Sequence, residues 1–215
     1  FGTSASILYN SGDNPQIING LITSVLFSDS NKKTYVSEGT INACNSLFYY
    51  LEDILNIEHT QMRWDKRCKN QDTEGIFISG FSGIAAPYWV SGFDDIYYKI
   101  NKNNKNEIIR AGMESIGFLV NDIIKMLTKS ISMNFPIITA SGGGSRDSLL
   151  QFISDLTGQI IRRPKIRDKT ALGVYRILNS NYKIQDEDKL FEPSKDRDKI
   201  TFKIKQWREI ISSLK

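Results

Sequence analysis

The stretch "IITASGGGSRDSLL" (residues 137–150) decides the fold class, because it joins two regular elements through a run of glycines. Its first residues are β-branched, which is typical of a strand, and a helical pattern follows from about Arg146 to Leu156. Between them, Gly142–Gly144 leave the backbone bare. Glycine serves either a tight turn or a close approach of another group to the backbone. Both readings stay open at this point.

The segments on either side predict an alternation of strands and helices. Upstream, residues 107–128 give the clearest helix, with an apolar stripe of Met113, Ile116, Leu119, Val120, Ile123 and Leu127. "FPIITA" (135–140) reads as a buried strand. Downstream, "QIIRR" predicts a short strand that ends at Pro164, and "DKTALGVYRIL" predicts a helix. Strands joined by helical crossovers run parallel, so we expect a parallel part of a sheet covered by helices.

The N-terminal part predicts three short strands at residues 5–10, 19–28 and 33–38, arranged as a meander. A helix pattern starts at Thr40, and "GIFISGF" (75–81) reads as a further strand. The last helix carries an apolar stripe of Trp207, Ile210, Ile211 and Leu214. Three strands followed by alternating strands and helices predict an α/β, ribonuclease H-like domain with a mixed sheet, the type found in actin, hexokinase and sugar kinases. We see no second core, so residues 1–215 are expected to form one domain.

The composition is that of an ordinary globular domain: 215 residues, 40% hydrophobic, with a net charge of +4. No apolar run approaches about 18 residues, so no membrane partner is expected, and no signal peptide is visible. The densest basic run, "KINKNNKN" (99–106), predicts a solvated loop. Without a clustered basic face or a motif, no nucleic-acid partner is expected.

The metal-ligating residue types are scarce. Cys44, Cys68 and His59 do not have the number or spacing that a zinc site requires. Two free thiols favour a reducing, cytoplasmic compartment, although one disulfide stays possible. The chain begins "FGTSAS" without Met, and we expect it to be a piece of a longer protein.

The glycines also suggest a ligand site. In open α/β sheets, ligands bind beyond the carboxyl ends of the strands, and Gly142–Gly144 lie between such a strand and a helix N-terminus, which suits phosphate. A second small-residue segment, Gly2 and Thr3, precedes the first strand and could contact phosphate oxygens. The alternatives are a structural turn and a frayed chain end.

Five segments together resemble the FGGY carbohydrate kinases, especially their glycerol kinase-like members. The first, "FISGFSGIAAPYW" (77–89), is similar to the family signature. The others are "YVSEGTI" (35–41), "IIRAGMESIGFLVNDIIKML" (108–127), "SGGGSRDSLLQFISDLTGQIIRRPKIRDKTALG" (141–173) and "FEP" (191–193). They occur in the family's order over nearly the whole chain, and the terminal helix with Trp207 also matches.

The resemblance implies ATP and Mg²⁺ as cofactors and assigns the nucleotide-binding residues. ATP would lie against Gly142, Gly143 and Gly144, and Asp147 would take the place of a polar residue near the adenosine. Gly2 and Thr3 match a Gly-Thr pair that contacts the β- and γ-phosphates. Asn45 stands where the nucleotide approaches the first helix.

The resemblance also implies what the chain does not contain. The family's aspartate base lies in a Gly-Asp-Gln motif upstream, in or near the N-terminal lobe that binds the sugar or polyol. Residues 1–215 would therefore be the C-terminal, ATP-binding lobe, without a catalytic residue or metal ligand and inactive alone. Separating the lobes exposes apolar surface, so self-association into a homo-oligomer is expected.

Several positions depart from the family pattern and leave the substrate open between glycerol-like and pentulose-like. Asn45 replaces a small glycine, Tyr49 a glutamine and Ser6 an aromatic residue, while Ser4 replaces a third glycine; "VSGFDD" follows Trp89. These departures favour an alternative, a catalytically degenerate binding or regulatory protein. An actin-like ATPase without a sugar substrate is a third possibility, against which the 77–89 signature argues.

The other conspicuous residues are assigned structural roles. Pro87–Trp89 would shape a loop near the interlobe cleft, Glu38–Gly39 would pack at a strand-to-helix turn, and Glu114 would be a hydrogen-bonded acid. Thr170 would cap or pack its helix, and His59 would be exposed to solvent.

Overall fold

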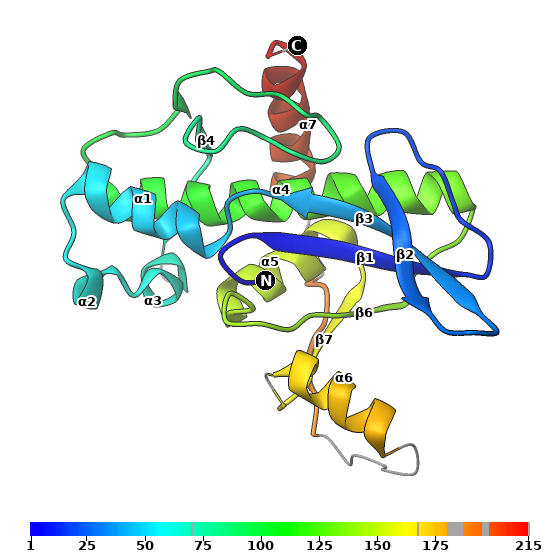
Figure 1. Ribbon diagram of the computed structural model, residues 1–215. Helices are drawn as coiled ribbons and strands as arrows, with labels where there is room; N and C mark the ends of the chain where they lie inside the picture. The colour runs from blue at the N-terminus through cyan, green and yellow to red at the C-terminus, as the bar shows by residue number, and fades with distance from the viewer. Residues whose placement is uncertain (70, 167, 180–186, 195–197, 215) are drawn as a thin grey trace.

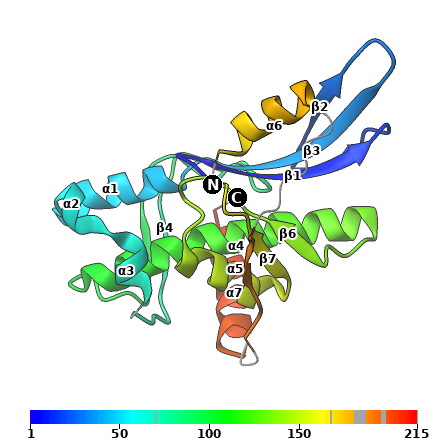
Figure 2. The same ribbon diagram turned by 90° about the horizontal axis from the view of Figure 1, so that it is seen from below.

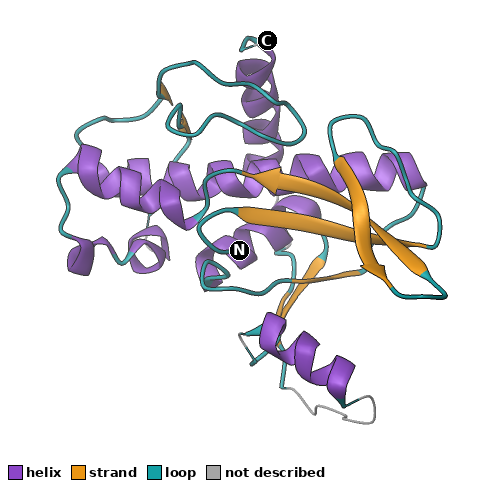
Figure 3. Cartoon of the chain, viewed as in Figure 1, coloured by secondary structure: helices purple, strands orange, loops and turns teal. Residues whose placement is uncertain are grey.

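The computed structural model describes residues 1–69, 71–166, 168–179, 187–194 and 198–214. Figure 3 shows a mixed α/β domain, and its buried apolar residues form one core. The strands are β1 (Ala5–Gly12), β2 (Ile22–Ser28), β3 (Lys33–Ile41), β4 (Ile76–Ile78), β5 (Ile96–Tyr98), β6 (Ile137–Thr139), β7 (Ile160–Arg163) and β8 (Lys189–Phe191). The helices are α1 (Asn45–Leu55), α2 (His59–Met62), α3 (Trp64–Lys69), α4 (Lys105–Ile131), α5 (Asp147–Thr157), α6 (Lys169–Leu178) and α7 (Asp198–Ser212).

The first sheet has the order β1-β3-β2, and both strand pairs are antiparallel. The three predicted strands are confirmed, but the predicted meander is wrong, because β3 and not β2 lies in the middle. β2 and β3 form a hairpin whose turn is fixed by Asp29, which accepts hydrogen bonds from the backbone N–H groups of Asn31 and Lys32. The connection from β1 to β2 is longer and lets β3 pair with both strands.

Strands β4 and β5 form a two-stranded antiparallel sheet, and the sheet β6-β7-β8 contains the parallel pair that the sequence predicts. β6 pairs parallel with β7, and β8 pairs antiparallel with the other side of β7. The prediction that "FPIITA" is buried is wrong, because Ile137 is 49% exposed. The physical reason is that, among the described residues, β6 pairs with a strand on one side only.

Helix α4 is the centre of the core, and the predicted stripe of apolar residues along it is buried. Figure 1 shows α4 running behind the β1-β3-β2 sheet, with α1 and α5 beside it. Its N-terminus is capped by Asn104, whose side chain accepts from the Glu107 N–H at 3.2 Å. The cap explains why the polar run 99–106 ends where a long apolar helix begins.

Gly39 in β3 is buried because α4 passes directly over it. A Cβ atom at this position would overlap the side chain of Ile123, so the expected packing role of Gly39 is confirmed. Gly39→Ala is expected to destabilise the domain by about 1–3 kcal/mol through overpacking. Denaturant unfolding measures this loss, and combining the change with Ile123→Ala should recover part of it. Strictly additive losses would contradict the packing explanation.

Helix α7 is held on α4 by buried polar groups as well as apolar contacts. Glu114 is 3% exposed and accepts from the guanidinium of Arg110 at 2.6 Å and from the ammonium of Lys203. Glu114 is therefore a hydrogen-bonded buried acid, as the sequence predicts. A second acid, Asp122, accepts from the indole of Trp207 at 3.0 Å and from the guanidinium of Arg208 at 2.9 Å.

Helix α6 differs from the others, since none of its described residues is buried. Figures 1 and 2 show it standing apart from α4 and α7. Thr170 does not cap this helix: Asp168 is the N-cap, and its carboxylate accepts from the Ala171 N–H at 2.9 Å. Thr170 itself is exposed.

Two further boundaries correct the sequence predictions. The helix pattern that starts at Thr40 begins structurally at Asn45, because Ile41 is the last residue of β3. The short elements β5, β8, α2 and α3 were not predicted, since three to six residues give no readable periodicity. His59 is exposed as expected, with its ring nitrogen 2.9 Å from a Glu52 carboxylate oxygen.

Candidate functional site

The glycine turn connects β6 to α5 and is fastened to the first residues of the chain. The Phe1 nitrogen donates to the Ser141 carbonyl at 2.9 Å, and the Gly144 N–H donates to the Phe1 carbonyl at 3.0 Å. Gly142 has a φ of +97°, and a Cβ atom there would overlap the Phe1 carbonyl. Gly142 is therefore required by the backbone itself.

Gly143 is different from its neighbours because the structure leaves space above it. It is exposed, and the nearest atom to a Cβ placed there is the amide nitrogen of Asn45, at 3.9 Å. At Gly144, a Cβ atom would lie 3.2 Å from both the Asn45 amide oxygen and the Cys44 sulfur. The folded chain thus explains the glycines at 142 and 144 but does not itself need one at 143.

The N-terminal segment and helix α1 complete this region. The Thr3 carbonyl accepts hydrogen bonds from the N–H groups of Cys44 and Ser46 and from the Ser46 hydroxyl, and the Asn45 N–H donates to the Gly2 carbonyl at 3.0 Å. The structure therefore brings Gly2, Thr3 and Asn45 beside Gly143 and Gly144, although they come from three distant parts of the sequence.

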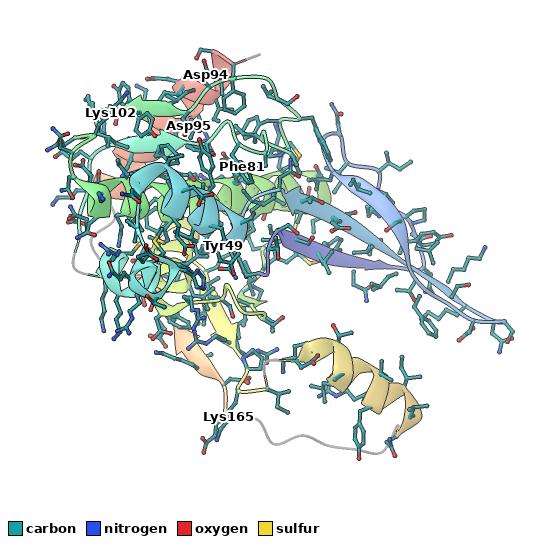
Figure 4. All side chains as sticks on the ribbon, turned by 60° about the vertical axis from the view of Figure 1, so that its left-hand side comes forward. Tyr49, Phe81, Asp94, Asp95, Lys102 and Lys165 are labelled. Carbon is teal, nitrogen blue, oxygen red and sulfur yellow. The ribbon has the colours of Figure 1, made fainter. Side chains whose placement is uncertain are left out.

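A pocket of about 260 Å³ opens at the glycine turn. It is lined by Ser141, Gly142, Gly143, Ser145, Arg146, Arg163, Pro164, Lys165, Glu187 and Lys189. Four of these side chains are cations and one is a carboxylate, so the pocket favours an anionic ligand. Figure 4 shows Lys165 on the surface, in the segment that leads from β7 to α6.

Asp147 lies in the first turn of α5 and does not line this pocket. Its carboxylate binds Lys189 at 2.7 Å and Arg163 at 2.8 Å. Hydrogen bonding to Lys189, followed by Arg163, holds the pKa of Asp147 below its usual value. Arg163 also donates to the Ser145 carbonyl at 2.7 Å. Asp147 thus fixes the two cations at the pocket wall.

Sequence reasoning missed these cations. Arg163 ends β7 beside the parallel strand β6, and the carboxyl ends of parallel strands meet at one edge of a sheet. The "QIIRR" strand therefore held a signal for a cation near the glycine turn. Lys189 carried no such signal, because its three-residue strand β8 was not predicted.

The signature segment 77–89 serves mainly to fix the loop around it. The Tyr88 hydroxyl donates to the Asp122 carboxylate at 2.7 Å, and the Trp89 indole donates to the Gly20 carbonyl at 2.8 Å. Burial, followed by the charge of Asp122, raises the pKa of Tyr88, so this hydroxyl stays protonated. Figure 4 shows Tyr49 and Phe81 near α1; they are 50% and 53% exposed.

Comparison with known proteins agrees with this arrangement. A family model described as "FGGY family of carbohydrate kinases, C-terminal domain" matches residues 1–180. The chain belongs to this family. The match covers the glycine turn, the N-terminal segment and helix α6.

Curated relatives of this FGGY domain include glycerol kinases. The chain is 29% identical to the glycerol kinase of Thermoanaerobacter pseudethanolicus over 98% of its own length and 46% of that protein. It is 28% identical to the glycerol kinase of Mycoplasmoides gallisepticum over 96% of its own length and 44% of that protein. The FGGY domain thus spans about half the length of the curated relatives it matches.

Solved structures confirm the predicted fold. The Plasmodium falciparum glycerol kinase with ADP superposes with a TM-score of 0.84 at 24% identity, covering 100% of this chain and 46% of that one. The xylulose kinase of Lactobacillus acidophilus gives a TM-score of 0.81 at 21% identity, covering 99% and 46%. The domain therefore has the fold of the sugar-kinase ATPases.

No helix in the described part of the chain is both long enough and apolar enough to cross a membrane. Within the same residues, His, Cys, Asp and Glu do not gather in any group of three that could hold a metal ion. Cys44 and Cys68 are free, buried thiols. Of the two alternatives that the sequence left open, two free thiols or one disulfide, the structure has the free thiols.

Proposed function

We propose that residues 1–215 form the nucleotide-binding lobe of a two-lobed kinase that transfers the γ-phosphoryl group of ATP to a hydroxyl of a sugar or polyol. One observation carries this proposal. The glycine turn, the Gly2–Thr3 segment and the start of α1 converge beside a cationic pocket, and Gly143 is left open there. A bare backbone next to cations and a helix N-terminus is suited to phosphate groups.

The residues present fit ATP in separate roles. Gly143 offers exposed backbone that phosphate can approach, and Gly142 makes the required turn, whereas Gly144 is buried and its N–H donates to the Phe1 carbonyl. Arg163 and Lys189 supply positive charge at the pocket wall. Asn45 lies beside the turn and is proposed to contact the nucleotide through its amide.

Gly2, Thr3 and Asp147 complete the proposed ATP site. Gly2 and Thr3 are exposed at the same place and would contact the terminal phosphates. Asp147 would act through the two cations it binds and not by touching the adenosine directly.

We assign no metal ligand to this chain. Mg²⁺ in kinases is commonly held by substrate phosphates with one or two carboxylates and several waters. Mg²⁺ is therefore proposed to arrive with ATP. ATP is an intracellular substrate and both thiols are free, so we also propose a cytoplasmic location.

The sugar or polyol and the catalytic base are proposed to belong to the other lobe. The relatives act as glycerol kinases, and solved structures with this fold include a gluconate kinase and xylulose kinases. The domain alone is proposed to be inactive, because phosphoryl transfer also requires a group that positions the hydroxyl and accepts its proton.

A phosphoryl-transfer assay on the full-length protein tests the proposal. ATP and Mg²⁺ are supplied with glycerol, xylulose or gluconate, and formation of ADP and of the phosphorylated product is followed. We expect turnover with at least one acceptor and none with the isolated domain. Tight ATP binding without turnover on any acceptor would favour the alternative, a kinase-like binding or regulatory protein. The residues Ser6 and Asn45, which differ from the family pattern, support that alternative.

A further inference from the structure

A second cavity, of about 430 Å³, lies between helix α6 and the ends of strands β6 and β7. In Figure 1, α6 lies below β7. Arg163 lines the pocket at the glycine turn, whereas Arg162 lines this α6 cavity together with Thr139, its register partner on β6. Pro164 lies between the two spaces and lines both. Successive side chains of a strand point to opposite faces, so the two arginines serve separate spaces.

Helix α6 turns a polar face to this cavity. The helix residues that line it recur at steps of three and four, which places them on one face of α6. They are Lys169, Leu172, Gly173 and Arg176. The apolar residues Val174 and Leu178, on the opposite side of the helix, are 55% and 76% exposed. A helix that closed a hydrophobic core would turn its apolar side inward, so the cavity is not an unfilled part of the core.

Gly173 leaves the backbone of α6 bare toward the cavity. A Cβ atom placed there meets no atom of another part of the described chain within 4 Å. The backbone at Gly173 is helical, so no unusual φ requires glycine. Glycine inside a helix is less stable than alanine, and the folded chain gives no reason for it here. A ligand that approaches the helix closely provides such a reason.

The charges around the cavity favour an anion. Arg162, Lys169 and Arg176 supply three cations, and Asp188 supplies one carboxylate. The guanidinium of Arg162 is already oriented: its Nη2 donates to the Thr139 hydroxyl oxygen at 2.9 Å, and its Nε lies 3.5 Å from an Asp188 carboxylate oxygen. The planar arrangement of N–H donors in a guanidinium matches the oxygens of a phosphate. A phosphate group is therefore the anion that this wall fits.

Two further features show what the phosphate is attached to. Pro164 and Leu172 give the cavity an apolar side that suits the face of a flat ring. Asp188 has acceptor capacity left, because one of its oxygens faces Arg162 and the other has no hydrogen-bond partner in the described part of the chain. A nucleotide whose base carries an amino group combines a phosphate, a flat ring and an N–H donor. A sugar phosphate lacks the flat ring.

We propose that the α6 cavity binds a nucleoside monophosphate with an amino-bearing base, for which AMP is the probe. The cations on Arg162 and Arg176 hold the phosphate, the base lies against Pro164 and Leu172, and its amino group donates to Asp188. The ligand joins α6 to the β6–β7 strands across the cavity. This site is separate from the glycine turn, so the inference does not rest on the proposed kinase reaction.

Titration calorimetry of the full-length protein with AMP tests the site. Gly143→Val fills the space at the glycine turn, so AMP that still binds to this variant occupies another site. Adding Gly173→Leu is expected to weaken AMP binding about 10-fold or more, because the new side chain extends into the cavity. It should not lower the thermal unfolding midpoint, since leucine favours a helix and meets no other part of the chain. Val174→Leu, on the opposite side of α6, is the matched control and should leave AMP binding unchanged.

A charge variant and two further ligands define the chemistry. Arg176→Gln should weaken AMP about 10-fold through the loss of a charge-assisted hydrogen bond, without changing the affinity for ATP. UMP lacks the amino group and ribose 5-phosphate lacks the base, so both should bind more weakly than AMP. Unchanged AMP binding in Gly173→Leu, or its complete loss in Gly143→Val, would overturn the proposal. Equal affinities for ribose 5-phosphate and AMP would contradict the assignment to a nucleotide. Loss of ATP binding by the unmodified protein, with AMP binding still dependent on Gly173, would overturn only the proposed function.

Discussion

Gly143→Val is expected to lower the affinity of the protein for ATP about 100-fold, which corresponds to about 2.7 kcal/mol of binding free energy and lies within the usual cost of steric overpacking. The isopropyl group would occupy the space above the turn into which we place phosphate. The fold should be unaffected, because, apart from the two adjacent residues, the nearest atom to a Cβ at this position is the Asn45 amide nitrogen at 3.9 Å. Titration calorimetry with ATP and Mg²⁺ measures the affinity.

Two further glycine variants make this test specific. Gly143→Ala adds only the Cβ atom and should weaken binding less than Val does. Gly142→Ala should lower the thermal unfolding midpoint, because Gly142 has a φ of +97° and its Cβ would overlap the Phe1 carbonyl. If Gly143→Val bound ATP as well as the unmodified protein while remaining folded, the glycine turn would not be the phosphate site.

Asp122→Ala is expected to cost about 2–6 kcal/mol of folding free energy, because the Tyr88 hydroxyl and the Trp207 indole lose their acceptor at about 1–3 kcal/mol each, whereas Arg208, whose side chain is 44% exposed, adds little. The Asp122 carboxylate accepts from the Tyr88 hydroxyl, the Trp207 indole and the Arg208 guanidinium. Removing it leaves three donors without their acceptor, and Trp207 is 1% exposed. Urea unfolding of the full-length protein measures the loss.

Less severe variants separate the contributions to this loss. Asp122→Asn keeps an acceptor oxygen but loses the charge that faces Arg208, so we expect a smaller loss than for Ala. Tyr88→Phe removes one donor and should cost about 1 kcal/mol. If Asp122→Ala were as stable as the unmodified protein, Asp122 would not be the group that holds α7 and the 77–89 loop together.

The long elements were predictable from sequence because their apolar periodicity has many repeats. Helix α4 runs through 27 residues, and its buried stripe was read correctly. The burial of β6 was misjudged, since an apolar run such as "FPIITA" shows which residues favour a strand but not whether neighbours cover it. The strand order β1-β3-β2 could not be predicted from the sequence either, because a local pattern does not show which of three strands lies in the middle of the sheet.

The candidate site was predicted in part. The glycines stood out by themselves, but their meeting with Gly2, Thr3 and Asn45 was expected only from the resemblance to FGGY kinases. In the structure these segments are held together by backbone hydrogen bonds. Any residue type can form such bonds, so the sequence does not reveal them. The binding roles of these residues stay predictions, and the pairing of Asp147 with Arg163 and Lys189 could not be read from charges scattered along the chain.

The hydrogen bonds at the Thr3 carbonyl have a mechanical consequence. They tie the first residues to the start of α1, while Phe1 ties the same residues to both sides of the glycine turn. The three segments therefore form one stiff unit, and none of them can swing by itself. A hinge that opens or closes access to this region has to lie outside the unit, so its bending would carry the turn, the helix end and the N-terminal residues together without changing their spacing.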